Sequence, residues 1–131
     1  MPAPPLVLAS TSPTRLALMR AAGLDVAAEP AGVDERAVEA PLKARGAGPD
    51  EIAVHLADAK ALAVSARHPE ALVIGADQTL GLGADLIVKA DTTEEARGRL
   101  ERMAGRTHEL HAAVAAARDG RIVWRHLATA R

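Results

Sequence analysis

The chain has 131 residues, which is enough for one domain around a single buried core. Its formal net charge is −1, with 49% hydrophobic and 25% charged residues, a balance typical of a folded globular protein. The near-neutral charge and a single Trp as the only Phe, Trp or Tyr residue argue against a nucleic-acid partner, and the absence of Cys excludes disulfides, thiolate zinc sites and cysteine nucleophiles.

The N-terminal part of the chain predicts a strand, a tight turn and a helix. Residues 6–9 are an apolar run suited to a buried strand. The run is too short for a signal peptide or a membrane span, so we expect a cytoplasmic protein with no membrane partner. Ser12 as N-cap and Pro13 as first helical residue indicate a helix over 13–22, which Gly23 ends.

Residues 24–48 contain several Pro and Gly residues and predict a short strand followed by a long loop. Pro49 then begins a second helix, whose first turn carries acidic residues at the positive end of the helix dipole. Lys60 is expected on the flank of this helix, beside an apolar stripe of Ile52, Leu56, Ala59 and Ala63.

Residues 72–76 give the strongest strand pattern in the chain. They are apolar throughout, as in a strand of a sheet that is covered on both faces. Asp77 and Gln78 are predicted to stand at the C-terminal end of this strand.

The following segment predicts a turn, a short strand and a third helix. Residues 81–84 indicate the turn and residues 86–88 the strand. A capping box that begins at Thr92 predicts a helix that ends at Gly105. Its apolar side, expected to face inward, consists of Ala96, Leu100 and Met103.

The C-terminal part predicts a hairpin. Its strands are expected over 108–117 and 121–128, joined by a type I′ turn at Asp119-Gly120. The order of elements predicts an α/β protein with a mixed, twisted sheet flanked by helices.

Two predicted strand ends carry polar side chains, and ligands of open α/β sheets collect at such ends. After the first strand, the hydroxyls of Ser10 and Ser12, a helix N-terminus and Arg15 suit a phosphate group. The alternative is a capped helix without a ligand. After residues 72–76, Asp77 is placed to hold a metal or to polarise water, or else to cap a turn.

The other candidate groups have an equally ordinary alternative. Glu35 lies in loop-like sequence, and Lys60 and Lys89 fit exposed surface cations. The five histidines are scattered and are expected at surface or half-buried positions; His108 and His111 would point to opposite faces of a strand. The sequence has no phosphate-binding Gly-x-x-x-x-Gly-Lys-Ser/Thr loop and no Gly-x-Ser-x-Gly elbow of a serine hydrolase.

Taken together, the polar motifs resemble those of the Maf family. The segment 8–15, Leu-Ala-Ser-Thr-Ser-Pro-Thr-Arg, resembles the family signature Leu-Ala-Ser-x-Ser-Pro-x-Arg. Four further motifs follow in the family's order: Val33-Asp34-Glu35, Leu56-Ala-x-x-Lys60-Ala61, Ile74-Gly75-Ala76-Asp77-Gln78 and Gly105-Arg106-Thr107-His108.

The resemblance implies a Maf/ITPase-like fold with a cleft at the strand C-terminal ends. It also implies a nucleoside triphosphate pyrophosphatase that needs a divalent cation, Mg²⁺ or Mn²⁺. Asp77 falls on the family's general base and Glu35 on the carboxylate that assists it at the metal. The residues matching positions that bind the triphosphate are Ser10, Ser12, Arg15, Lys60 and Lys89.

Two positions bear on the substrate. Gln78 resembles the family branch that acts on 7-methyl-GTP, where the dTTP/UTP branch has Thr. Thr14 matches neither the Arg of the dTTP/UTP branch nor the aromatic residue that is frequent in the other. The sequence thus favours 7-methyl-GTP or another modified nucleotide, with dTTP or UTP as the alternative.

Family members continue beyond the position of Arg131, so residues 1–131 are interpreted as a single Maf-like domain without the usual C-terminal part. Three functions stay open on the sequence alone: the enzyme, a catalytically impaired nucleotide-binding remnant, and a protein with a regulatory role in cell division. A homodimer is a further expectation, because a partner subunit would close an incomplete sheet.

Overall fold

A computed structural model describes residues 4–82, 85–87 and 92–131. The strands that follow one another across its mixed sheet are β2 (Val26–Glu29), β1 (Leu6–Ala9), β3 (Leu72–Leu82), β5 (Glu109–Arg118) and β6 (Arg121–Ala130). A short β4 (Asp85–Ile87) pairs with the end of β3. The helices are α1 (Pro13–Ala21), α2 (Glu35–Ala44), α3 (Pro49–Arg67) and α4 (Thr93–Met103).

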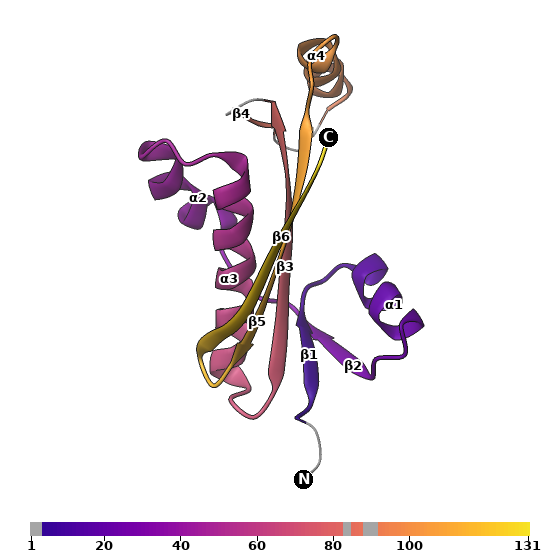
Figure 1. The fold of residues 1–131 in the computed structure, drawn as a ribbon, viewed down its shortest axis with the longest axis vertical. Helices are drawn as coiled ribbons and strands as arrows, with labels where there is room; N and C mark the ends of the chain where they lie inside the picture. The colour runs from indigo at the N-terminus through magenta and orange to yellow at the C-terminus, as the bar shows by residue number, and fades with distance from the viewer. Residues whose placement is uncertain (1–3, 83–84, 88–91) are drawn as a thin grey trace.

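The helices lie on both faces of the sheet. Figure 1 shows the sheet nearly edge-on, with α3 along one face and α1 beside β1 and β2 on the other. This arrangement confirms the predicted α/β class. In the described part of the chain, no helix is both long enough and apolar enough to cross a membrane.

The first β-α-β unit forms as the sequence predicts. β1 pairs in parallel with both β2 and β3. The Ser12 side chain accepts a hydrogen bond from the Arg15 backbone N–H, and Pro13 is the first residue of α1. Gly23 follows the helix with φ +87°, a left-handed conformation that glycine adopts at little cost.

The prediction of a long loop before Pro49 is wrong, because α2 occupies much of that segment. Asp34 caps this helix by accepting a hydrogen bond from the Ala37 N–H. Leu42 is buried and packs with Val38 against α3, so the helix gains an apolar contact that its composition concealed. Pro41 is tolerated within α2 although it lacks an N–H to donate.

α3 and β3 pack together so closely that the core consists largely of small side chains. Alanines and valines of α3, β1, β3 and β5 form one buried cluster with Ala71. Gly75 leaves no room for a side chain, since an added Cβ would lie 2.3 Å from the Ala57 carbonyl oxygen. The Thr79 hydroxyl donates to the Pro49 carbonyl at 2.7 Å and ties the start of α3 to the strand.

β3 continues past the position where sequence placed its end. Asp77 and Gln78 lie in the middle of this strand, not after it, because β5 pairs with β3 from Val73 to Gly81. Gly81 is therefore in the strand and not in the predicted turn. The strand expected over 86–88 is observed as β4. Residue 88 of that expected range lies outside the described part of the chain.

The capping of α4 is confirmed, but its predicted inward side is wrong. The Thr92 hydroxyl accepts from the Glu95 N–H. None of the α4 residues is buried, and Leu100 is 68% exposed. Figure 1 shows α4 beyond one end of the sheet, where neither sheet face covers it.

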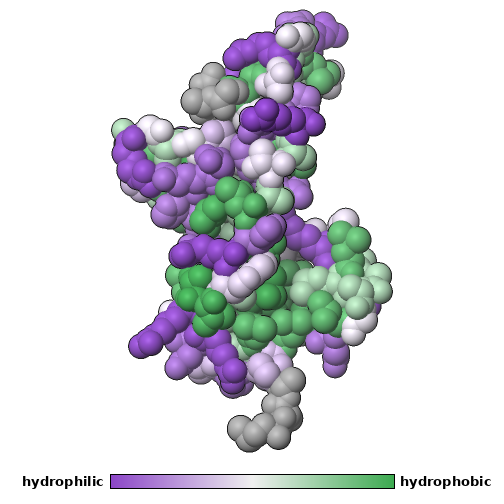
Figure 2. Space-filling model, in the orientation of Figure 1, coloured by the Kyte–Doolittle hydropathy of each residue, from purple (hydrophilic) through white to green (hydrophobic). Residues whose placement is uncertain are grey.

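The C-terminal hairpin is confirmed, including its turn. Asp119 and Gly120 both have positive φ, 52° and 73°, as a type I′ turn requires. The hairpin contacts α3 through the Gly120 N–H, which donates to the buried Ser65 hydroxyl at 2.9 Å. In Figure 2 apolar surface is gathered over the lower half of the molecule.

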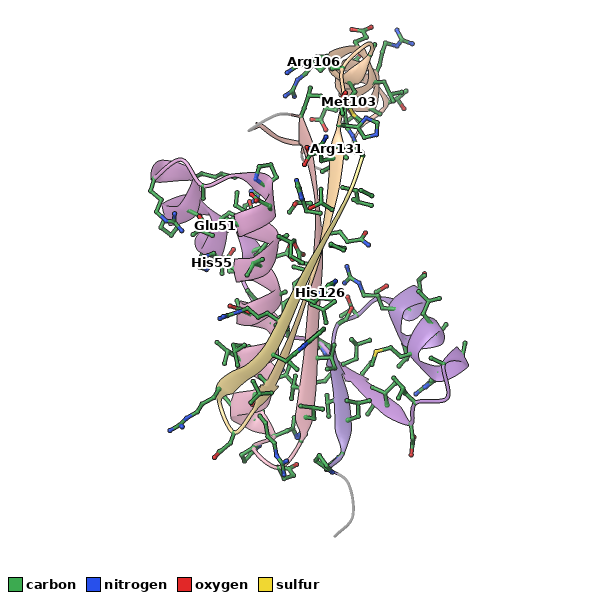
Figure 3. The ribbon with its side chains drawn as sticks, viewed as in Figure 1. Glu51, His55, Met103, Arg106, His126 and Arg131 are labelled. Atoms are coloured by element: carbon green, nitrogen blue, oxygen red, sulfur yellow. The ribbon has the colours of Figure 1, made fainter. Side chains whose placement is uncertain are left out.

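One histidine departs from the expectation. His111 is only 5% exposed, and its Nδ1 lies 3.0 Å from the Thr129 hydroxyl. It points to the α3 side of β5, where this partner on β6 compensates for its burial. His108 precedes β5, so the prediction that it shares a strand with His111 is wrong. Figure 3 shows His55 on α3 and His126 on β6, on separate elements.

Candidate functional site

Lys60 connects the two carboxylates that the sequence singled out. Its Nζ lies 2.9 Å from Asp77 Oδ1 and 2.9 Å from Glu35 Oε1. The three residues come from α3, from the middle of β3 and from the first position of α2. The Lys60 Nζ also lies 3.5 Å from the Ala76 carbonyl oxygen. The structure thus brings together three predicted site residues that are far apart in the chain.

The two carboxylates differ in how deeply they are buried. The Asp77 side chain is 10% exposed and the Lys60 side chain 14%, whereas Glu35 is 51% exposed. Asp77 faces α3 because strand alternation turns it to the same side as Val73 and Thr79. One carboxylate is therefore fixed in the interior, and the other lies at the surface beside the same ammonium group.

The environment raises the pKa of both Asp77 and Lys60. Burial is the main cause that raises the pKa of Asp77, and together with the negative charge of Glu35 it outweighs the hydrogen bond and charge of Lys60 and the charge of Arg15. Burial alone would lower the pKa of Lys60, but hydrogen bonds and charges of Asp77 and Glu35 together outweigh it. Lys60 is therefore held as a cation, and Asp77 accepts a proton more readily than an ordinary Asp.

The turn after β1 forms the wall of a polar pocket. The Ser12 N–H donates to the Ser10 hydroxyl at 3.0 Å, and the Arg15 N–H donates to the Ser12 hydroxyl at 3.3 Å. These bonds hold the turn against the N-terminus of α1, whose partial positive charge favours anions. The pocket has a volume of about 270 Å³. It is lined by Ala9, Ser10, Thr11, Ser12, Arg15, Pro30, Ala31, Gly32, Val33, Glu35 and Lys60.

A larger, mainly apolar pocket of about 450 Å³ lies between α1 and the sheet face opposite α3. Leu18 and Met19 of α1 line one side, and Ile74 and Ala76 of β3 are on the sheet. The polar residues along it are Arg15, Gln78 and Asp77, although the Asp77 side chain itself faces α3. Arg15 lines both pockets, which are therefore adjacent.

The two predicted specificity residues differ in position. Gln78 is exposed and lines the larger pocket. Thr14 is exposed on α1 and lines neither of these pockets. Lys89, the remaining predicted triphosphate ligand, lies outside the described residues.

The described residues contain no group of three or more His, Cys, Asp or Glu side chains that could enclose a metal. Glu35 lines the polar pocket and Asp77 does not, and the Lys60 ammonium lies between the two carboxylates. Mg²⁺ in nucleotide enzymes is held by one or two carboxylates together with substrate phosphates and waters. The donor set is therefore compatible with such an ion only when a phosphate supplies further oxygens.

Sequence reasoning missed the segment between β2 and α2. Pro30 to Val33 line the polar pocket, and Gly32 has φ +69°. The Pro and Gly content predicted a loop here, but nothing local showed that it would form a pocket wall. The signal that could have revealed this segment is Asp34. Its side chain caps the N-terminus of α2, so it marks where the segment ends.

Comparison with known proteins gives consistent matches. Residues 5–131 match the family model described as Maf-like protein. The 7-methyl-GTP pyrophosphatase of Brucella abortus biovar 1 (strain 9-941) is 50% identical over 125 residues, covering 95% of this chain and 63% of that protein. A 7-methyl-GTP pyrophosphatase of Mesorhizobium japonicum is 51% identical over the same shares.

A third relative, the nucleoside triphosphate pyrophosphatase of Caulobacter vibrioides, is 48% identical over 127 residues, 97% of this chain and 63% of that protein. The chain thus spans about 63% of the length of these relatives. Among solved structures, a HAM1 protein from Coxiella burnetii has a TM-score of 0.63 at 16% identity, covering 97% of this chain and 70% of the other. That likeness shows the shared fold. Because the family model matches nearly the whole chain, the protein belongs to the Maf-like protein family.

Proposed function

We propose that this protein is a nucleoside triphosphate pyrophosphatase that releases pyrophosphate from 7-methyl-GTP. The observation that carries the proposal is the Lys60 ammonium, held 2.9 Å from both Asp77 and Glu35 at the wall of a polar pocket. Relatives near 50% identity are named 7-methyl-GTP pyrophosphatase, and Gln78 lines the adjacent larger pocket. A Gln offers both a donor and an acceptor, which suits the edge of a purine.

In the proposed reaction a water oxygen bonds to the α-phosphorus. The bond between that phosphorus and the oxygen bridging to the β-phosphate breaks, and pyrophosphate leaves with the bonding electrons. Asp77 accepts the proton of the attacking water, a role that its raised pKa suits because the base must bind that proton in the transition state. Lys60 and Arg15 offset the negative charge that develops on the leaving pyrophosphate.

We propose that Glu35 and Asp77 hold a divalent cation, Mg²⁺ or Mn²⁺, when the triphosphate is bound. Both carboxylates contact one nitrogen, so their oxygens lie close enough to share one ion after Lys60 turns toward a phosphate. Such an ion supplies positive charge at the phosphates. We further propose that the protein acts in the cytoplasm. Sizing of the purified protein distinguishes a monomer from a homodimer.

The test is pyrophosphate release from 7-methyl-GTP, GTP, dTTP and UTP with Mg²⁺, in the parent and in Asp77→Asn. Asparagine keeps the shape of Asp77 but removes its charge and its ability to take a proton, so turnover should fall by about 10²-fold or more. Nucleotide binding, measured by calorimetry, should survive far better.

Asp58→Asn is the matched control. Asp58 is a second carboxylate held by a cation, with Arg125 Nη2 at 2.7 Å, but it lies outside both pockets. Turnover of this variant should stay near the parent value. Near-parent turnover in Asp77→Asn would refute the assignment of the base. Binding without pyrophosphate release in the parent would favour a nucleotide-binding protein without catalysis.

A further inference from the structure

The segment Pro30–Val33 forms one whole wall of the polar pocket. It connects β2 to Asp34, the cap of α2, and all four residues line the pocket. Ala31 packs on the core cluster, while Gly32 is exposed at φ +69°. The position of this short segment therefore sets the shape of the pocket opposite the turn after β1.

One end of the segment is held by the site itself, through the ion pair of Glu35 with Lys60 at 2.9 Å. The other end is held by the C-terminal residues of α3. Arg67 Nη2 donates to the Pro30 carbonyl oxygen at 2.7 Å. The same nitrogen lies 3.4 Å from Glu29 Oε2, and His68 Nε2 lies 2.9 Å from that oxygen.

These contacts come from a single helix face. Lys60 and Arg67 are seven residues apart on α3, almost two full turns, so they project on the same side about 10 Å apart. α3 itself is packed on the sheet through Ala57, Ala61 and Val64, all at most 1% exposed. A rigid element thus holds the pocket wall at both of its ends.

The charges at the outer end agree with this arrangement. The hydrogen bond with His68 and the charges of His68 and Arg67 lower the pKa of Glu29, against the effect of burial. Glu29 is therefore an anion at neutral pH. It is the last residue of β2 and pairs with Ala9, the residue before Ser10. The anchor is therefore adjacent in the sheet to the turn that forms the other side of the pocket.

We infer that Arg67 is a positioning residue for phosphate binding: with Glu29 and His68 it holds the Pro30–Val33 wall against the pocket. Arg67 does not line the pocket and acts only through Pro30 and Glu29. The inference rests on the proposed function for its substrate class. Loss of the anchor frees one end of the wall and weakens binding of the triphosphate, while the proton-accepting group Asp77 stays in place.

The experiment compares Arg67→Ala with Arg125→Ala. Arg125 is the matched control, because it also joins α3 to another element, through Asp58, but touches neither pocket. In Arg67→Ala the Kd for inorganic tripolyphosphate and the KM for 7-methyl-GTP should rise about threefold to tenfold, the usual range for one lost hydrogen bond. The kcat should stay within about twofold. Arg125→Ala should lower the melting temperature and leave both Kd and KM unchanged.

Hydrogen exchange gives a readout that needs no catalysis. The amides of β2, which pairs with β1 directly before the segment, should exchange faster in Arg67→Ala than in the parent, and not in Arg125→Ala. Arg67→Lys should restore part of the affinity, because an ammonium can still donate to the Pro30 carbonyl. Glu29→Gln serves as second variant should Arg67→Ala fail to fold; it removes the charge that Arg67 and His68 both contact.

The possible failures are distinguishable. A parent that binds tripolyphosphate but releases no pyrophosphate refutes the proposed function, while affinity and exchange still test the anchor. Parent-like affinity and exchange in both Arg67→Ala and Glu29→Gln overturn the anchor, whatever the activity. An equal loss of affinity in Arg125→Ala would also overturn it, because the effect would then be general destabilisation.

Discussion

Gly75→Ala should destabilise the protein far more than its size suggests. An added Cβ at this position would lie 2.3 Å from the Ala57 carbonyl oxygen, 2.7 Å from the Ala61 nitrogen and 3.0 Å from the Ala61 Cβ. Ordinary van der Waals contact begins at 3.4 Å. The first contact is therefore about 1 Å too short, and it is made to backbone that cannot move like a side chain.

The variant can be accommodated only if α3 moves away from β3. Overpacking of a well-packed core typically costs about 1–3 kcal/mol, and a shift of the longest helix in the described part of the chain favours the upper end of that range. A domain of this length loses roughly 3–5 °C of Tm per kcal/mol, so we expect a loss of about 10 °C or more. Urea denaturation should show a lower midpoint with an unchanged slope.

The same movement should affect the site, because Lys60 is the residue next to Ala61. A retreat of about 1 Å lengthens the path from α3 to Asp77, now spanned by an Nζ–Oδ1 distance of 2.9 Å. Displacements of about 1 Å in an active site can cost up to 10²-fold in rate. We therefore expect a lower kcat for Gly75→Ala even at a temperature where the variant is fully folded.

Gly98→Ala is the control. Gly98 lies within α4, and no atom would lie within 4 Å of its added Cβ. Alanine is the better helix former, so this variant should gain about 0.5–1 kcal/mol. A Gly75→Ala variant within about 0.5 kcal/mol of the parent would show that α3 and β3 are not in the close contact described.

Two further outcomes are expected. The pKa of Asp77, followed by NMR of its carboxyl carbon, should rise in Lys60→Met, because burial then acts without the cation of Lys60. The same pKa should fall in Glu35→Gln, because that variant removes a nearby negative charge. Shifts of this pKa in the same direction in both variants would contradict the electrostatics of the site. Gln78→Thr should lower kcat/KM for 7-methyl-GTP by about 5–150-fold, the equivalent of roughly 1–3 kcal/mol for a lost matched hydrogen bond. The effect on kcat/KM for dTTP and UTP should be much smaller. A parent protein that prefers dTTP or UTP would refute the substrate proposal.

The parts of the fold that sequence predicted well are those with local signals. Ser12 and Pro13 mark the start of α1, and the Asp119-Gly120 pair marks the hairpin turn. In each case the deciding energy is a cap or a backbone conformation within a few residues. Such terms can be evaluated without knowledge of any distant part of the chain.

The errors concern features that depend on distant partners. Asp77 looked like the end of a strand because a carboxylate is costly in a sheet interior. The partner that makes it acceptable, Lys60, is 17 residues away on another element. α4 shows the reverse error: Leu100 has helical spacing typical of a buried side, yet no described element covers it. α2 was missed because Pro41 concealed a helix that Leu42 anchors against α3.

Resemblance named residues that the structure brings near one another, Lys60, Asp77 and Glu35 among them, but it did not show how they are organised. Lys60 was expected on the flank of its helix, as a cation for phosphate. In the structure its charge is already engaged by Asp77 and Glu35. No local pattern relates Glu35, at the start of a helix that sequence missed, to a strand that begins at Leu72.

The pairing of Lys60 with Asp77 and Glu35 affects how a triphosphate can bind. In the described residues, the charged groups at the two pockets are the cations Lys60 and Arg15 and the anions Asp77 and Glu35, so their charges cancel. A triphosphate brings several negative charges, and the described residues of the site offer no net positive charge to receive them. Lys60 cannot move to a phosphate without leaving the buried Asp77 unpaired, which is costly. A divalent metal would pair with both carboxylates and with the phosphates, and this charge balance among the described residues is the physical reason for which we propose one.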